Sequence, residues 1–494
     1  MHVLMVTSEA TPFAKSGGLA DAVSALSRAL RRIGHDVRIV MPRYGIIPTD
    51  GLVRLRSGLD VETGDGVERA VVFKGVLPDS DVPVFFIDRE EYFGRPGIYG
   101  SKTEPDFADN PQRFSFLSRA AFRLCDALRW KPDVLHAHDW PCSFAPVYLR
   151  HAEPDYDTVA SVLTIHNLGY QGIYPKDGFP SFGLPWELFH GAGFEYFDSI
   201  NALKAGITCA DGLATVSPTY AREIQTPELG CTLDGLLRAR GPDLVGILNG
   251  VDGVDWNPST DPLIARRYSI EDMSGKAACK TALQREFGLP EDTEKPLIGM
   301  VSRLTDQKGI GELFGPTYGC AAKLCMDMDL QFIVQGTGDS WCEAEILALS
   351  ARLPNFRARI GYSERTAHMI EAGSDFFMMP SRYEPCGLNQ MYSLRYGTLP
   401  IAHRTGGLSD TISNYNQETG AGSGFLFDHL TPRAVYDTTG WAVWAYYNRA
   451  EQLDAMRRRA MALDFSWEAA AREYEELYRG VSAPRRGAGA HTIA

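Results

Sequence analysis

The sequence predicts an α/β protein made of two doubly wound Rossmann-like domains that face an interdomain cleft. Short apolar runs alternate with stretches of helical periodicity, the alternation restarts near residue 297, and polar side chains recur directly after the apolar runs. Such alternation is typical of parallel sheets covered by helices. Ligands of these sheets bind outside the carboxyl ends of the strands, where the polar residues are expected to lie.

The first strand, turn and helix form the most informative segment. Residues 3–6 are an apolar run, and a loop with Lys15, Gly17 and Gly18 follows it. Gly34 has the position of a helix C-cap glycine. The apolar residues between these glycines share one helical face: Leu19, Val23, Leu26, Leu30 and Ile33. Free N–H groups at the helix start, its dipole and the Lys15 charge favour a bound diphosphate, with a purely structural turn as the alternative.

Further strands are expected wherever an apolar run recurs. In the first half these runs are residues 37–41, 84–87, 134–136, 159–165, 212–216 and 244–248. In the second half they are residues 297–301, 330–335, 357–360, 375–379, 398–401 and 424–427.

Two such series predict two domains. We expect an N-terminal domain of residues 1–253 and a C-terminal domain of residues 254–463. A closing helix at residues 464–480 is expected to complete the first domain. The small, basic segment 481–494 is expected to be a disordered tail.

Composition narrows the class of protein. The 494 residues are 44% hydrophobic and 22% charged, as in an ordinary globular protein, and the net charge of -13 argues against nucleic acid as a partner. No run approaches the ~20 apolar residues of a membrane span, and the first strand begins too early to leave room for a signal peptide. Nine scattered cysteines without a C-x-x-C pair indicate a reducing cytosol. We therefore expect a cytoplasmic protein with no membrane partner.

Two patterns suggest a metal site, and we assign none to either. His136 and His138 have the spacing of a ligand pair, but no third His or Cys cluster accompanies them, so a polar, sugar-facing wall is favoured. Asp-x-Asp triplets begin at Asp79, Asp155 and Asp327, all in turn-like contexts where Asp is common. We expect neither a metal nor a cofactor.

Two loops of the second half carry residues suited to a phosphate. Arg303 and Lys308 lie five residues apart between a strand and a helix, where a guanidinium fork and a point charge can both reach a diphosphate; a solvated basic loop is the alternative. Glu384 precedes Gly387, whose missing side chain allows a phosphate to approach backbone N–H groups. For Glu384 the alternative is a carboxylate that only caps a helix.

These motifs together resemble a known family. AKSGGLAD (14–21), HAHDW (136–140), TIHNLGYQG (164–172), NGVD (249–252), SRLTDQKG (302–309), SRYEPCGLNQ (381–390) and RTGGLSDT (404–411) stand in the order found in bacterial glycogen synthases and plant starch synthases. The resemblance covers residues 3–479, with slight departures at Ser16, Gly169 and Asn389. It implies the GT-B arrangement of two Rossmann-like domains, with residues 1–253 on the acceptor side and residues 254–463 on the sugar-nucleotide side. It also implies a retaining, metal-independent transferase that moves glucose from ADP-glucose to the 4-OH at the non-reducing end of an α-1,4-glucan.

The resemblance also implies roles for particular residues. The catalytic set is Glu384, His166, Asp139, Arg303 and Lys308, and the substrate-binding set is Lys15, Gly17, Gly18, Asp21, Asn167, Asn249, Cys386, Gly387 and Leu388. Arg303 and Lys308 would hold the diphosphate, Glu384 the glucose hydroxyls, and Asp139 the acceptor side. We favour front-face attack with the leaving phosphate as base, and a covalent intermediate stays open.

Other activities remain as alternatives. A UDP-glucose-using or sucrose-type synthase of the same fold is the nearest one. A non-catalytic glucan-binding scaffold is disfavoured, because binding glucan needs no diphosphate clamp. An oxidoreductase is disfavoured as well, because no strand is followed by G-x-G-x-x-G.

Overall fold

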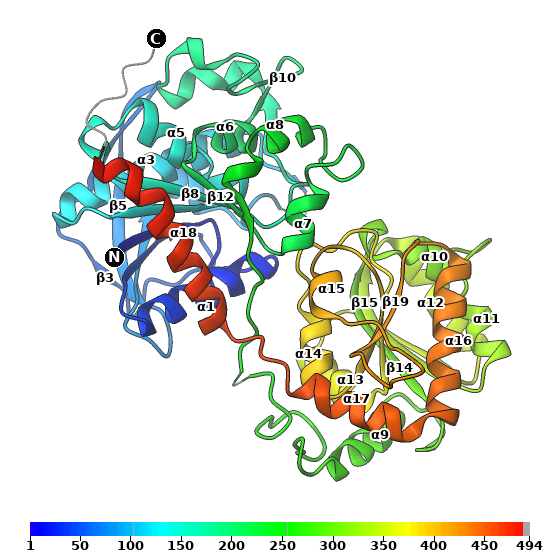
Figure 1. Cartoon of the computed structure of the whole chain (residues 1–494). Coiled ribbons are helices and arrows are strands. Elements are labelled where there is room, and N and C mark those ends of the chain that lie inside the picture. The colour runs from blue at the N-terminus through cyan, green and yellow to red at the C-terminus, as the bar shows by residue number, and fades with distance from the viewer. Residues whose placement is uncertain (102, 254, 488–494) are drawn as a thin grey trace. The chain divides into compact units, whose positions relative to one another are not determined.

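The structure is a computed structural model that describes residues 1–101, 103–253 and 255–487. The chain folds into two compact units, which are shown in Figure 1 and are described separately below. Unit 1 contains Met1–Val216, Ala221–Gly250 and the C-terminal segment that begins at Trp467. Unit 2 contains Ser217–Tyr220 and Val251–Ser466.

Within its described residues, unit 1 is centred on a ten-stranded sheet with the order β13-β12-β8-β7-β1-β2-β6-β5-β3 and with β4 paired to β5. The strands are β1 (His2–Val6), β2 (Asp36–Pro42), β3 (Val53–Arg54), β4 (Leu59–Thr63), β5 (Gly66–Val76), β6 (Pro83–Asp88), β7 (Val134–His138), β8 (Ala160–Ile165), β12 (Gly212–Thr215) and β13 (Leu244–Gly246). All neighbours from β13 to β6 are parallel. Every strand predicted in the first half is one of these, which confirms the parallel sheet.

The strand order of unit 1 reverses between β1 and β7. Chain order runs from β1 to β6 on one side and from β7 to β13 on the other, as in a doubly wound Rossmann sheet. Doubly wound sheets bind ligands outside the carboxyl ends of the strands at such a reversal, which here means at the loops after β1 and β7.

Helices cover both faces of this sheet. They are α1 (Gly18–Arg32), α2 (Glu90–Phe93), α3 (Asn110–Leu128), α4 (Asp139–Cys142), α5 (Phe144–His151), α6 (Ala202–Cys209), α7 (Pro218–Glu223, shared by both units), α8 (Asp234–Ala239) and α18 (Trp467–Gly487). A small antiparallel sheet joins β9 (Ile173–Pro175), β10 (Glu195–Tyr196) and β11 (Ser199–Asn201). Four residues of the predicted apolar face of α1 are buried, namely Leu19, Val23, Leu26 and Leu30, and the fifth, Ile33, is the half-buried C-cap residue. Gly34 follows with a φ of +100°, which glycine adopts without strain.

Helix α18 continues beyond the predicted closing helix and corrects one expectation. It packs against α1 and β8 and runs to Gly487, so residues 481–487 of the expected tail are helical. The reason lies at Gly212 in β12, where a Cβ would come within 2.7 Å of the Val481 side chain: the helix continues because Val481 packs on the sheet. Residues 488–494 of that tail lie outside the described residues.

Unit 2 is a second doubly wound sheet. Its described residues form six strands, all parallel, in the order β16-β15-β14-β17-β18-β19. They are β14 (Leu297–Leu304), β15 (Gln331–Gly338), β16 (Phe356–Ile360), β17 (Phe376–Met379), β18 (Leu399–His403) and β19 (Phe425–Phe427). In chain order this is 3-2-1-4-5-6, the Rossmann order, and the reversal lies between β14 and β17. All strands predicted in the second half are confirmed.

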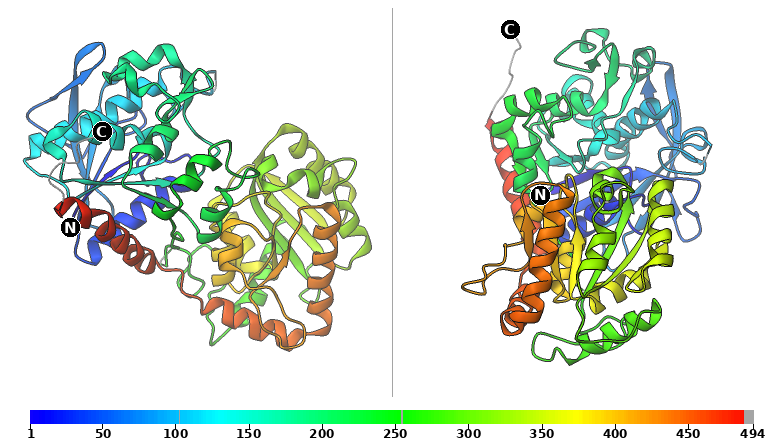
Figure 2. Two further views of the ribbon diagram at one scale, coloured as in Figure 1. Left: turned by 45° about the horizontal axis from the view of Figure 1, so that its top comes forward. Right: turned by 90° about the vertical axis from the view of Figure 1, so that its right-hand side faces the viewer.

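Helices flank the sheet of unit 2 on both sides (Figures 1 and 2). They are α9 (Ser274–Glu286), α10 (Ile310–Phe314), α11 (Ala321–Asp327), α12 (Ser340–Arg352), α13 (Glu364–Gly373), α14 (Asn389–Arg395), α15 (Gly406–Thr411), α16 (Pro432–Asn448) and α17 (Ala450–Met461). Two buried apolar clusters lie on opposite faces, because successive side chains of a strand point to opposite sides: Phe332 belongs to one cluster and Ile333 to the other.

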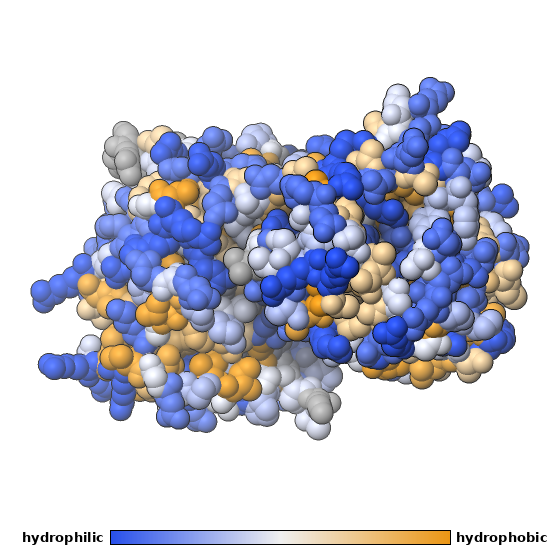
Figure 3. Space-filling model, turned by 90° about the horizontal axis from the view of Figure 1, so that it is seen from below, coloured by the Kyte–Doolittle hydropathy of each residue, from blue (hydrophilic) through white to orange (hydrophobic). Residues whose placement is uncertain are grey.

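On the face shown in Figure 3, hydrophobic residues are interspersed among hydrophilic ones. Among the described residues, no helix is both long and apolar enough to span a membrane.

Candidate functional site

The predicted phosphate-binding residues of unit 2 lie around one hollow at the reversal point of its sheet. The hollow has a volume of about 170 Å³. It is lined by Met300, Val301, Ser302, Arg303, Lys308, Met378, Met379, Pro380, Ser381, Glu384, Gly387, Leu388 and Asn389. Arg303 lies near the carboxyl end of β14, and Glu384 follows β17, the neighbouring strand. The crevice expected of a doubly wound sheet is therefore lined by both charged motifs.

One backbone hydrogen bond and one from the Asn389 side chain hold the segments around this hollow together. Arg382 donates its N–H to the Gln307 carbonyl at 2.8 Å, and the Asn389 amide donates to the Val301 carbonyl at 2.7 Å. Gly309 has a φ of +68°, and a Cβ there would lie 1.8 Å from the Pro380 carbonyl oxygen. Only glycine fits at that position, so it lets the Lys308 turn approach the loop after β17.

Lys308 is held by a carboxylate. Its Nζ donates to Glu384 Oε2 at 2.5 Å, and Ser381 Oγ donates to the same oxygen at 2.8 Å. The side chains of Lys308 and Glu384 are 18% and 8% exposed, so the alternative of a solvated basic loop does not hold for Lys308. Arg303 is exposed and donates to Gln307 Oε1 at 3.1 Å.

The other predicted residues of this loop matter mainly for the path of its backbone. Gly387 has a φ of +72°, and a Cβ there would overlap the Gln390 side chain, so glycine is required. Cys386 is buried, and Leu388 directly precedes α14.

Tyr362 is a candidate site residue that the sequence analysis did not predict. It is 69% exposed and follows β16, at the same carboxyl edge of the sheet. An aromatic residue directly after a strand was the available signal.

In unit 1, the predicted residues gather at the reversal point between β1 and β7. The loop after β1 carries Lys15, whose Nζ pairs with Asp21 Oδ2 at 2.7 Å. Asp21 also accepts a hydrogen bond from Thr11 Oγ1 at 2.8 Å. Gly17 is the N-cap of α1, where Gly18 begins the helix, and a Cβ at Gly17 would meet nothing within 4 Å. Packing therefore does not demand a glycine at position 17.

Asp139 follows β7 and supports the loop after β8. Its Oδ1 accepts the His166 backbone N–H at 2.7 Å. Burial raises the pKa of the Asp139 carboxyl to about 7, although the backbone N–H groups of His166 and Asn167 act in the opposite direction. Asp139 has a φ of +55°, a conformation that Asp tolerates better than most residues. The structure thus places the Asp139 carboxylate against the backbone that carries His166 and Asn167.

His166 is a neutral imidazole at ordinary pH. Burial lowers its pKa to about 3, and its Nε2 lies 3.1 Å from His138 Nδ1. Asn167 Oδ1 accepts the Gly169 N–H at 3.0 Å, which shapes the same loop. Asn249 lies beyond the end of β13, at the same carboxyl edge of the sheet.

The prediction of a sugar-facing wall is wrong for His136. Its ring is completely buried between the Tyr478 hydroxyl and Thr164 Oγ1, each at 2.7 Å. Side chains alternate along β7, and His136 points to the face that α18 covers. The described residues contain no group of three or more His, Cys, Asp or Glu side chains placed to hold a metal ion.

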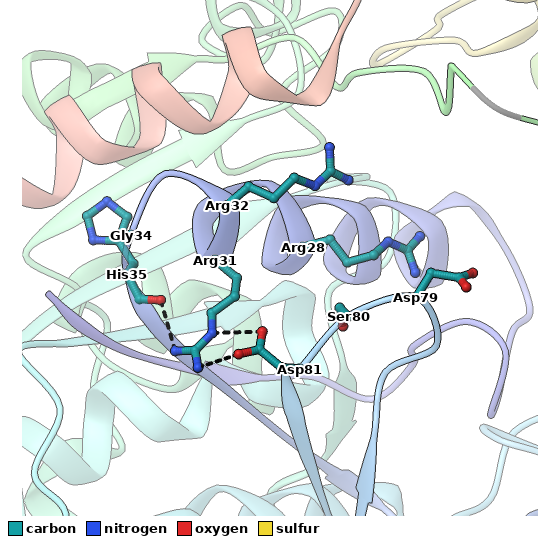
Figure 4. A pocket seen from close by; sticks show the side chains of 8 residues that line it. All are labelled: Arg28, Arg31, Arg32, Gly34, His35, Asp79, Ser80 and Asp81. Carbon is teal, nitrogen blue, oxygen red and sulfur yellow. Dashed lines mark hydrogen bonds and ion pairs between the residues drawn. The ribbon is translucent and has the colours of Figure 1, made fainter.

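A hollow of about 300 Å³ lies in unit 1, at the end of α1 opposite to Gly17 and Gly18. Figure 4 shows Arg31 between the His35 carbonyl and Asp81, with Arg32 and Arg28 directed away from that pair. Arg31 makes a two-point contact with Asp81 at 2.9 and 2.7 Å, and Arg32 pairs with Glu468. The hollow lies where α1 leads into β2, which is the amino edge of the sheet, and carboxylates already oppose two of its arginines.

Comparisons with known proteins cover nearly the whole chain. Residues 2–239 match the starch synthase catalytic domain, and residues 284–437 match glycosyl transferases group 1. The glycogen synthase of Treponema denticola is 55% identical over 97% of this chain and 98% of its own length. Glycogen synthase 1 of Geobacter metallireducens is 47% identical over 97% and 95%.

Solved structures agree with these matches. The catalytic domain of starch synthase IV from Arabidopsis thaliana, bound to ADP and acarbose, superimposes with a TM-score of 0.87 and 32% identity, covering 98% of this chain and 99% of that one. A sucrose-phosphate synthase from Thermosynechococcus elongatus has a TM-score of 0.60 and 17% identity, covers 98% and 99% of the two chains, and shares the fold.

Proposed function

Because the chain belongs to the family of bacterial glycogen synthases and plant starch synthases, we propose that it transfers glucose from ADP-glucose to the non-reducing end of an α-1,4-glucan. The chain is a glycosyltransferase of the GT-B fold and a glycogen synthase by family. The proposal adds ADP-glucose as the donor, the 4-OH of the glucan as the acceptor, retention of configuration, and the residues that bind the substrates. It also adds a cytoplasmic location, which the nine free thiols support.

The hollow of unit 2 is the observation that carries the proposal for the donor. Arg303 and Lys308 supply two positive charges at the crevice where doubly wound sheets bind nucleotides. Departure of a nucleoside diphosphate leaves negative charge on its outer phosphate, and cations held in place stabilise that charge. We assign Arg303 and Lys308 to the diphosphate, with backbone N–H groups of Gly387 and Leu388 beside them. The buried Cys386 completes the backbone of that loop.

Glu384 is assigned to the glucose hydroxyls. Its Oε2 is occupied by Lys308 and Ser381, which fixes the carboxylate and leaves Oε1 to accept from a sugar. The same ion pair links the sugar contact to the phosphate contact, because one lysine holds both. Tyr362, exposed at this edge, offers a ring face on which a base can stack.

In unit 1 the assigned groups are mainly neutral hydrogen-bonding groups. His166 stays uncharged because burial lowers its pKa to about 3, so it can bond a hydroxyl without adding charge. Asn167, Asn249 and Asp21 are assigned to the substrate as well. Lys15 and its partner Asp21 are the charged exceptions, and we assign the Lys15 charge to the donor diphosphate, with N–H groups of Gly17 and Gly18 beside it. The open space at Gly17 supports this, since packing gives no other reason for a glycine there.

A donor comparison tests the proposal. The purified protein should incorporate glucose into glycogen from ADP-glucose, and more slowly from UDP-glucose. Arg303→Ala serves as the control for transfer at the assigned site. Incorporation from neither donor would refute the proposed reaction, and faster incorporation from UDP-glucose would refute the proposed donor.

A further inference from the structure

Glu9 is a buried carboxylate at the reversal point of unit 1 that none of the assignments above uses. It lies three residues after β1 and is 2% exposed. Its Oε1 accepts hydrogen bonds from Ser16 Oγ at 2.7 Å and from the Tyr99 hydroxyl at 2.6 Å, and its Oε2 accepts the Ser16 backbone N–H. A carboxylate that accepts several donors binds them more strongly than a neutral acceptor would.

The wall behind Glu9 is fixed by buried groups. Burial, followed by the nearby Glu9 charge, raises the pKa of Tyr99 well above its usual range, so its hydroxyl stays a donor. The Tyr99 carbonyl accepts from the Asn110 amide at 2.8 Å, and the neighbouring Ile98 carbonyl accepts from Arg113 at 3.1 Å. Arg113 is completely buried. Glu9 is therefore held against a rigid part of the unit.

The loop in front of Glu9 carries Lys15. Two contacts tie this loop down at its ends: the backbone pairing of Ala10 with Ala14 at 3.0 and 3.1 Å, and the Thr11 N–H on the Ala20 carbonyl at 3.3 Å. Between them, the Ser16 backbone and hydroxyl are bound by Glu9, one residue after Lys15. The Lys15 side chain is 53% exposed and its Nζ pairs with Asp21 Oδ2, so its direction depends on that ion pair and on the backbone at residues 15 and 16 more than on packing.

We propose that Glu9 is a positioning residue that acts through Ser16 to hold Lys15 in the orientation needed by the donor diphosphate. This inference rests on the proposed function, since it assigns a purpose to the Lys15 loop. Glu9 itself touches no substrate in this account. Its contribution is to keep the loop ordered before the donor arrives, so that binding does not have to order it.

A double-mutant cycle tests this directly. We expect Glu9→Gln to lower kcat/KM for ADP-glucose about tenfold or more, the scale of losing hydrogen bonds to a charged group. We expect Lys15→Ala to lower it further. In the Lys15→Ala background, Glu9→Gln should have almost no additional effect, because residues that act through one another are not additive. ADP affinity should be unchanged by Glu9→Gln.

Two further variants separate positioning from folding. Ser16→Ala removes one of the hydrogen bonds without touching the buried carboxylate, and it should give a smaller loss with the same dependence on Lys15. Glu153→Gln is the matched control: Glu153 is a 4% exposed carboxylate of unit 1 bound to Arg123, remote in sequence from the Lys15 loop. It should lower the melting temperature and leave kcat/KM unchanged.

The outcomes distinguish this inference from the proposed function. Losses from Glu9→Gln and Lys15→Ala that multiply in full would show that Glu9 does not act through Lys15, and would overturn the inference alone. Normal activity of Glu9→Gln or of Ser16→Ala would also overturn it alone. Normal activity of Lys15→Ala would refute the role of that lysine and the inference with it. Absence of glucan synthesis by the unmodified chain would refute the proposed function.

Discussion

The two reversal points of this molecule have the same topology and different chemistry. In unit 2 the crevice is lined by Arg303, Lys308 and Glu384, and the lysine is ion-paired within the hollow. In unit 1 the corresponding loops carry His166, which burial keeps neutral, and Asp139, whose pKa burial raises to about 7. One fold therefore carries Arg303 and a buried Lys308–Glu384 pair in one unit, and neutral hydrogen-bonding groups beside the more exposed Lys15–Asp21 pair in the other. The difference teaches that the strand order sets where a ligand binds, and the loops set which one.

The charged residues of unit 2 should show the largest effects. Arg303→Ala or Lys308→Ala should lower kcat/KM by about 10²–10³, because each removes a charge from the leaving diphosphate. Steady-state kinetics with ADP-glucose measures this. Thermal unfolding should separate the two variants: Arg303 is exposed, so its loss should leave stability unchanged. Loss of Lys308 leaves Glu384 buried without its cation and should lower the melting temperature. Near-normal kcat/KM in either variant would contradict the cationic site.

Asp139→Asn should have a smaller effect and should change the pH profile. We expect about a tenfold loss, since the neutral amide holds the His166 N–H more weakly than a carboxylate does. In the unmodified protein kcat/KM should rise as pH increases through about 7, where the raised pKa of Asp139 places its ionisation. The variant should lack this rise.

The raised pKa of Asp139 should also make the stability of the protein depend on pH. Its folded pKa is raised above the unfolded value, so the folded state keeps a proton that the unfolded state loses. The free energy of unfolding should therefore fall as pH rises from about 4 to about 7, relative to the variant. A profile parallel to that of Asp139→Asn would contradict the buried, neutral character assigned to unit 1.

His136 should give an effect of the opposite sign. Burial lowers its pKa to about 3, so the unfolded state binds a proton that the folded state does not. The free energy of unfolding should fall by about 1 kcal/mol per such histidine between pH 6.5 and 5.5. Urea unfolding of His136→Gln should show a correspondingly shallower loss over this range. An unchanged slope would mean that His136 is charged in the folded state.

Metal removal should have the smallest effect. If Arg303 and Lys308 meet the diphosphate charge, no cation is needed in the chemical step. Activity should survive exhaustive treatment with EDTA, measured as glucose incorporation. Near-complete loss that Mg²⁺ or Mn²⁺ restores would replace the side-chain clamp with a metal.

An element of the fold could be predicted from the sequence when the pattern that indicates it lies within the element itself. The parallel strands were predicted because each is a short, continuously buried apolar run, such as Ala160–Ile165. Strand β5 (Gly66–Val76) was missed because its exposure varies along its length, and β9–β11 because they are only two or three residues long. The prediction that the tail is disordered from residue 481 was wrong because Val481 packs at Gly212, which is far away in sequence.

The candidate site shows the same contrast between local patterns and contacts of residues far apart in sequence. Arg303, Lys308 and Glu384 were found because charged residues directly after apolar strands are unusual. The contact between Lys308 and Glu384 was not predicted. It depends on the close approach of the Pro380 backbone to Gly309. Glu9 was missed because its donors, Ser16 and Tyr99, are a loop residue and a residue 90 positions away. His136 was wrongly predicted to face a sugar because the helix that covers it, α18, is far away in sequence.

Direct binding of ADP is the most direct test of the central claim that unit 2 holds the diphosphate and Lys15 adds to it. Calorimetry should compare the unmodified protein, Arg303→Ala and Lys15→Ala. Arg303→Ala should weaken ADP binding strongly, and Lys15→Ala should leave it nearly intact while ADP-glucose use falls sharply. A Lys15→Ala protein that no longer binds ADP, or an Arg303→Ala protein that binds it normally, would contradict the account.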